Sequence, residues 1–239
     1  MKTPILLWVI AGLVLAGPAL ASGIELSVGS CTGSPGAQTG YANLQCAGGQ
    51  DFVLVLTFEP AEDISDLVAA DWILDALTSN DVHSDGNFWD WQTANASAFS
   101  LSRTIPPPQC VGFKTDAWSA LNSGDSWAAA VLRSNRVRRA GSVFRPSDLA
   151  VTANQKLFLA RMLLHTNEAV EAGGDLRGCC QSQITLALLQ VSPVSAHSNP
   201  TTILSSSAGA TLEATPATNC VGSVGTNHRS WGALKSLCR

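Results

Sequence analysis

Charged residues are scarce in this sequence. Lysine, arginine, aspartate and glutamate make up 13% of the chain, against about 25% in an average soluble domain. The formal net charge is −4, so the chain lacks the excess of positive charge that would attract nucleic acid or anionic lipid. Hydrophobic residues reach 46%, which is ample for a core and argues against charge-driven disorder.

Motifs of common enzyme classes are also missing from the sequence. It contains no P-loop, no G-x-G-x-x-G segment and no G-x-S-x-G segment. No C-x2-C pair occurs, and no histidine stands at zinc-ligand spacing from two cysteines, so a zinc site is not expected. A Ser-His-Asp triad would have to be assembled in space, because the four histidines are scattered at His83, His165, His197 and His228.

Long hydrophobic runs are absent apart from the first 21 residues. Lys2 supplies a positive charge, Ile5–Leu15 is apolar apart from one glycine, and Ala19–Ala21 has the small-x-small pattern of a cleavage site. The run is shorter than the ~20 apolar residues that a membrane-spanning helix needs. We therefore expect a signal peptide at residues 1–21 and a secreted or periplasmic protein with no membrane span after cleavage.

Seven cysteines in an exported chain predict a framework of disulfides. The expected pairs are Cys31–Cys46, Cys220–Cys238, and Cys110 with Cys179 or Cys180. Cys31 and Cys46 flank a Gly/Ser-rich turn. Adjacent side chains of a strand point to opposite faces, so only one of the two vicinal cysteines can meet Cys110. The pairing Cys110–Cys179 leaves Cys180 as the free thiol that an odd number requires.

Hydrophobic runs of strand length recur across residues 22–191, each bounded by Gly, Pro, Asn or Ser. Phe52–Phe58 is apolar on both faces, which is typical of a central strand. Leu67–Leu77 and Gln155–His165 also fit a helical period, but we expect strands there. The other expected strands are Ile24–Val28, Ala96–Leu101, Ser126–Leu132, Arg136–Phe144 and Ile184–Val191, the last ended by Pro193. This pattern predicts an all-β fold, an antiparallel β-sandwich.

Two further segments carry expectations about the surface. Residues 192–239 are rich in Ser, Thr and Ala and are expected to form a tail, with a short C-terminal helix that starts at Ser230 and docks on the domain. One basic cluster is expected on the solvent side of a strand, with an anion site as the alternative; it consists of Arg136, Arg138 and Arg139.

Residues 81–87 (DVHSDGN) resemble the first half of a calcium-binding loop. The candidate calcium ligands are Asp81, Asp85 and Asn87. The segment departs from the pattern, because His83 stands where an oxygen ligand is wanted and Gln92 where a bidentate glutamate belongs. A polar hairpin turn explains the same residues. Calcium is the one cofactor that the sequence suggests, and otherwise none is expected.

The segment Phe88–Trp91 places two tryptophans on the same side of an extended chain. Trp89 and Trp91 are candidate binding residues, since exposed tryptophan often stacks on sugars or anchors a protein partner. Packing in or beside the core is the alternative interpretation of both.

The ending WGALKSLCR, residues 231–239, resembles the W-G-x-I-K-S-L-Y-R ending of an uncharacterised family of secreted bacterial proteins. The family's other matching features are Gly23–Ser27, the cysteines 31, 46 and 110, the Trp-rich segment 88–91, Gly178-Cys179 and Ile184–Val191. The likeness implies an immunoglobulin-like or cohesin-like sandwich and brings no activity with it. Cys238 stands where the family has an aromatic residue, which favours its pairing with Cys220.

The sequence therefore predicts a secreted, non-catalytic β-sandwich module. Its role would be structural or adhesive, through binding of an extracellular protein or glycan and not nucleic acid. One alternative is a secreted hydrolase whose site joins His165 or His83 to an aspartate and a serine. The other is a calcium-dependent binding module.

Overall fold

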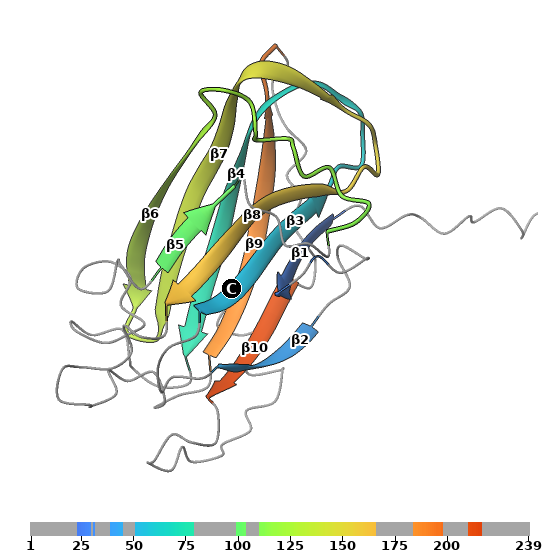
Figure 1. The fold of residues 1–239 in the computed structure, drawn as a ribbon. Helices are drawn as coiled ribbons and strands as arrows, with labels where there is room; N and C mark the ends of the chain where they lie inside the picture. Colours follow the sequence, from blue (N-terminus) through green and yellow to red (C-terminus); the bar gives the residue numbers. More distant parts are fainter. Residues whose placement is uncertain are drawn as a thin grey trace, which may run out of the picture.

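A computed structural model shows the fold of the chain as two layered β-sheets (Figure 1). It describes residues 23–29, 31, 39–44, 51–78, 99–103, 110–165, 184–197 and 210–216, and at 39–44 and 210–216 it describes the backbone only. These residues form ten strands and no helix. The expected all-β sandwich is confirmed.

The strands divide between a four-stranded sheet of order β1-β3-β8-β5 and a six-stranded sheet of order β2-β10-β9-β4-β7-β6. Every described neighbour pair is antiparallel except β2 and β10, which run parallel. Figure 1 shows the four-stranded sheet in front of the other, with β5 and β6 at the same side of the sandwich. The strands are β1 Gly23–Val28, β2 Thr39–Leu44, β3 Asp51–Glu59, β4 Ile64–Thr78, β5 Phe99–Ser102, β6 Gly124–Arg133, β7 Arg136–Val151, β8 Leu157–His165, β9 Ile184–Ser195 and β10 Ala210–Pro216.

Both segments that also fitted a helical period are strands, β4 and β8. In β4 the alternate residues Trp72, Leu74 and Ala76 are buried in the core between the sheets. In β8, Leu157, Leu159 and other residues of the inner face are buried in the same core. Burial between two layers favours the period of two over the helical alternative, because a strand sends alternate side chains to one face.

A second, smaller apolar cluster lies on the outer face of the four-stranded sheet. It consists of Cys31, Val55, Cys110 and Phe158, with Val53 and Phe113 packed against it. The connector between β5 and β6 contributes Cys110 and Phe113 to this cover. Trp118 of the same connector packs into the main core, and its indole Nε1 donates to the Phe158 carbonyl at 3.0 Å. This cover explains why β3 is apolar on both faces, as its sequence predicted for a central strand.

The structure joins Cys31 to Cys110 in a disulfide, so the expected pairs Cys31–Cys46 and Cys110–Cys179 are wrong. Between the two cysteines of the first expected pair, Thr39–Leu44 forms β2 of the opposite sheet. Cys31 follows β1 beside β3, where the amide of Gly29 donates to the carbonyl of Val53 at 3.0 Å. Cys110 lies on the same outer face. Because Cys110 is bonded to Cys31, the alternative pairing Cys110–Cys180 is wrong as well.

The six-stranded sheet extends into the residues that were expected to form a tail. β9 does not end at Pro193 but runs to Ser195, and β10 pairs with β9 and β2. β10 pairs with β9 only up to Leu188, so among the described strands Pro193 is paired on one side alone, opposite Ala70 of β4.

Asp66 at the start of β4 holds the far end of β9. Its carboxylate accepts hydrogen bonds from the Ser195 hydroxyl and, at 2.7 Å, from the His197 amide. The Ser195 bond is the main reason that the pKa of Asp66 lies below its usual value, since these donors favour the charged form. This polar clamp fixes the chain beyond residue 191 to the sandwich.

Candidate functional site

The residues that the sequence proposed for binding lie outside the described part of the chain. This applies to Trp89 and Trp91 and to the calcium candidates Asp81, Asp85 and Asn87, which all stay predictions. The pairing Cys220–Cys238 and the leader at residues 1–21 also lie outside it. Among the residues that the structure describes, no cluster of three or more His, Cys, Asp or Glu could hold a metal ion.

A polar row of three residues crosses three neighbouring strands of the four-stranded sheet. His165 ends β8, with Nδ1 2.7 Å from an oxygen of Asp51 on β3 and Nε2 2.9 Å from the hydroxyl of Ser100 on β5. In the tautomer with a proton on Nδ1, the ring donates to the carboxylate and accepts from the serine. Serine, histidine and aspartate thus stand in the order that acyl-transfer chemistry uses.

The register of the sheet creates this row. Asp51 lies directly opposite His165, while Ser100 lies opposite Leu163, two residues before the histidine on the same face. His165 and Asp51 are part-exposed, at 27% and 46% of their side-chain surface. Arg161 lies opposite Ser102 on this face, and its buried Nε has no hydrogen-bond partner in the described structure.

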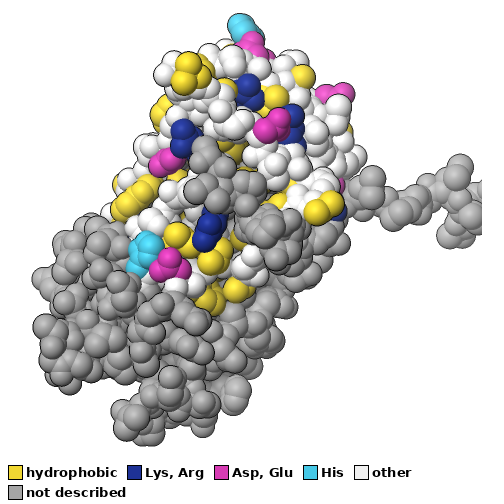
Figure 2. Space-filling model, in the orientation of Figure 1, with side chains coloured by type: hydrophobic (Ala, Val, Ile, Leu, Met, Phe, Trp, Pro, Cys, Tyr) yellow, Lys and Arg dark blue, Asp and Glu magenta, His cyan; other side chains and the backbone are white. Residues whose placement is uncertain are grey.

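Sequence reasoning named His165 as a possible base but could not name its partners. Asp51 and Ser100 are 114 and 65 residues away from His165 in the chain. Figure 2 shows this side of the molecule, where acidic and basic side chains are interspersed and each visible histidine lies beside an acidic side chain. The only signal in the sequence was the placement of these residues at or near the ends of expected strands.

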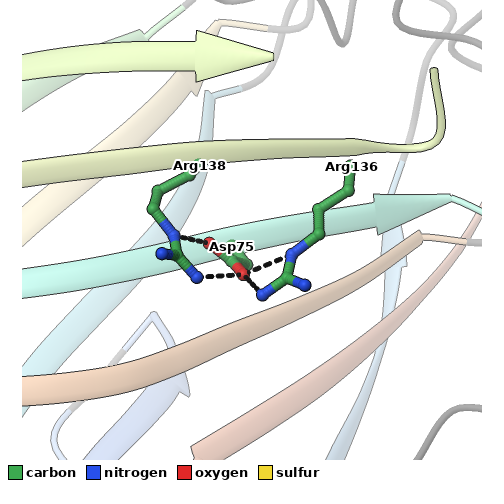
Figure 3. Close-up of polar contacts among 3 residues, drawn as sticks. All are labelled: Asp75, Arg136 and Arg138. Carbon is green, nitrogen blue, oxygen red and sulfur yellow. Dashed lines mark hydrogen bonds and ion pairs between the residues drawn. The ribbon is translucent and has the colours of Figure 1, made fainter. Parts of the chain in front are cut away.

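A second polar cluster surrounds Asp75 on the opposite sheet (Figure 3). The fully buried carboxylate of Asp75 lies between Arg136 and Arg138 of the neighbouring strand β7. Arg136 Nε donates at 2.7 Å, and Arg138 donates from Nε at 2.8 Å and from a terminal nitrogen at 3.1 Å. The bond to Asp75 raises the pKa of Arg138, because it favours the charged form.

Arg139 points to the inside of the sandwich and is completely buried. Its guanidinium lies 3.7 Å from the ring centroid of Phe99 on β5 and 4.1 Å from that of Trp127 on β6. Burial lowers its pKa to about 9, which still leaves the group charged at neutral pH. The expectation of a solvent-facing cluster is therefore wrong for Arg139, which lies between the two sheets. Arg136 and Arg138 lie on the opposite face of β7, where they hold the buried Asp75 and keep 15% and 33% of their side chains exposed.

The strand β6 forms an exposed edge of the six-stranded sheet. It follows β7 at the end of the strand order, and no described strand lies beyond it (Figure 1). Most of its ten residues are exposed, including the apolar side chains of Trp127 and Leu132 at 36% and 43%. Its sequence GDSWAAAVLR has no lysine or proline, the residues that commonly protect sheet edges.

The two edges of the other sheet are better protected. β5 has four residues, too few to template a long partner strand. In β1 every residue from Gly23 to Ser27 is buried. β6 therefore offers the longest exposed backbone edge among strands whose side chains the structure describes.

Comparisons with known proteins identify no family. No family model matches the chain, and no curated protein matches it. A solved cohesin module from a Clostridium perfringens ATCC13124 family 33 glycoside hydrolase is similar at 9% identity and a TM-score of 0.35, covering 82% of this chain and 100% of that one. In the described residues, no helix is long and apolar enough to cross a membrane.

Proposed function

We propose that this chain is a secreted, non-catalytic module that binds an extracellular protein at the exposed edge of β6. The observation that carries the proposal is a ten-residue, largely exposed edge strand that has no lysine or proline and whose charged residues stand only near its two ends. Such an edge presents unpaired N–H and C=O groups, to which an extended segment of a partner can add as a further strand. Affinity would come from main-chain hydrogen bonds and selectivity from the side chains beside Trp127.

Export from the cytoplasm is part of this proposal. The disulfide Cys31–Cys110 supports it, because such bonds persist in oxidising compartments. The signal peptide at residues 1–21 would direct the export. We also propose that the chain belongs to the secreted family with the W-G-x-[IL]-K-S-L-x-R tail, because residues 231–239 have this ending.

Selection of displayed peptides tests the strand-addition proposal. We expect the mature chain to select extended ten-residue peptides from a random library and to protect the amides of residues 126–132 from hydrogen exchange when they bind. The amides of β1 serve as the internal control, because that strand is already buried. Peptides that protect another surface and leave β6 unchanged would contradict the proposal, as would the absence of any binder.

A second candidate function is acyl-ester hydrolysis at the row Ser100–His165–Asp51. In this reading His165 takes the Ser100 proton as the hydroxyl attacks the ester carbonyl, and returns a proton to the leaving alcohol. A water then cleaves the acyl-serine with His165 again acting as base. Asp51 orients the ring, and Arg161 could hold an anionic group of the substrate.

Covalent labelling with a fluorophosphonate tests this second function. A reactive Ser100 should be labelled in the wild type and lose the label in Ser100→Ala and His165→Ala. Asp51→Asn should slow labelling by about 100-fold or more, since the ring would lose its orienting acceptor. Ser102→Ala is the matched control, because Ser102 lies on the same strand and face. An unlabelled wild-type protein would eliminate the hydrolase.

A further inference from the structure

We infer that the strand which pairs with β6 is β6 of a second copy of this chain. The inference rests on the proposed function and names its partner. An antiparallel β6–β6 contact around a two-fold axis would join the two six-stranded sheets into one continuous sheet. Both copies would then cover the same exposed edge, which is the arrangement that a two-fold contact requires.

The sequence of β6 selects one register for this contact. Opposite residues must share a face of the joined sheet, so registers that place even-numbered residues opposite odd-numbered ones are excluded in the regular part of the strand. A two-fold axis at Ala129 places Trp127 opposite Val131 of the other copy and Ala128 opposite Ala130. An aromatic side chain opposite a β-branched one is a favourable cross-strand pair.

The side chains of β6 allow this close approach. The residues around the proposed axis are alanines, and Ala128 and Ala130 are exposed on the outer face. Trp127 is 36% exposed although it packs against Arg139 on its inner side. The pairing would cover the exposed part of this ring. The irregularity between Val131 and Arg133 ends the regular part of the strand beyond the last proposed pair.

The charges at the two ends of β6 favour the antiparallel arrangement. The strand carries Asp125 near its start and Arg133 at its end. An antiparallel contact brings the acidic end of one copy beside the basic end of the other, whereas a parallel contact would place like charges together. The Asp125 side chain is 27% exposed and has one oxygen engaged by Arg103 at 3.4 Å.

Two double variants of the exposed alanines test both the partner and the register. Ala128→Glu with Ala130→Glu would place glutamate opposite glutamate across the axis. Ala128→Lys with Ala130→Glu would place lysine opposite glutamate. In both variants the new Glu side chain at 130 lies beside Arg138 within its own chain, so the two differ only at residue 128. Thermal unfolding of each variant verifies that the fold is kept.

We expect the wild type to dimerise in sedimentation equilibrium with a dissociation constant of about 10–100 µM, between the micromolar and the millimolar level. The Lys/Glu variant should dimerise at least as tightly, and the Glu/Glu variant at least about 10-fold more weakly, with the difference shrinking in high salt. Hydrogen exchange of residues 126–132 should slow as the wild type associates.

Three results would overturn the inference. They are a wild type that stays monomeric at about 1 mM, equal association of the two folded double variants, and a dimer whose β6 amides stay unprotected. A monomer whose β6 amides are protected by selected peptides would keep the proposed function and remove the second copy as the partner. Peptides that protect another surface would instead remove the proposed function while leaving a charge-dependent dimer in place.

Discussion

Replacing both Cys31 and Cys110 with alanine is expected to lower the free energy of unfolding by about 4.5 kcal/mol, the chain-entropy value for a loop of this size. The bridge closes a sequence separation of 79 residues, so its loss would release a large part of the unfolded chain. Both cysteines also belong to the apolar cluster on the outer face of the four-stranded sheet. Equilibrium denaturation of the non-reduced wild type and variant measures the difference.

The single variant Cys46→Ala is the matched control for this prediction. It removes the cysteine that the sequence favoured as the partner of Cys31 and should leave the bridge to Cys110 in place. Mass spectrometry of non-reduced peptides should show Cys31 linked to Cys110 in the wild type and in this variant. A peptide in which Cys31 is linked to Cys46 would contradict the structure, and a loss below about 1 kcal/mol would contradict the stabilisation by a long loop.

Asp75→Asn is expected to destabilise the protein by about 3 kcal/mol, because it removes one partner of a buried ionic cluster. Asp75 is fully buried, and Arg136 keeps only 15% of its side chain exposed. An asparagine of equal size would leave two guanidinium groups without their carboxylate. Thermal unfolding should show a fall of about 9 °C in the midpoint for a domain of this size.

Asp71→Asn provides the control for the Asp75 variant. Asp71 lies on the same strand and the same face, four residues earlier, but it is exposed. Its replacement should change the free energy of unfolding by no more than about 0.5 kcal/mol. If the two variants were equally stable, the carboxylate of Asp75 would not hold the arginines as the structure shows.

A strand could be predicted from the sequence where its residues form a clear hydrophobic run or alternate between apolar and polar. β3 and β9 begin at or next to the start of their hydrophobic runs. β4 was ambiguous in sequence, because its apolar residues fit two periods. The structure shows why it is a strand, since β7 and β9 pair with it on both sides. β10 was missed although its sequence ATLEATP alternates apolar and polar residues, because it lies in a stretch rich in Ser, Thr and Ala that was expected to form a tail.

The partners of polar and sulfur-bearing side chains could not be predicted in the same way. Cys31 was paired with a neighbour in sequence, whereas the structure brings it to Cys110 across a sheet. Arg139 belongs to a charged run that indicates an exposed strand, yet its position in β7 points it between Phe99 and Trp127. These errors have a common cause, because such contacts depend on sheet order and register.

The sequence by itself determined the fold class. Its hydrophobic runs have the length and period of strands, and such strands must be buried in a layered β-structure. It also provided the basis for expecting an exported, disulfide-containing protein. Only the tertiary structure decided which strand became the exposed edge, how Ser100, His165 and Asp51 form one row, and which cysteines meet. Alternation of side chains is a local property of the chain, whereas neighbourhood across strands is set by the order in which distant segments pair.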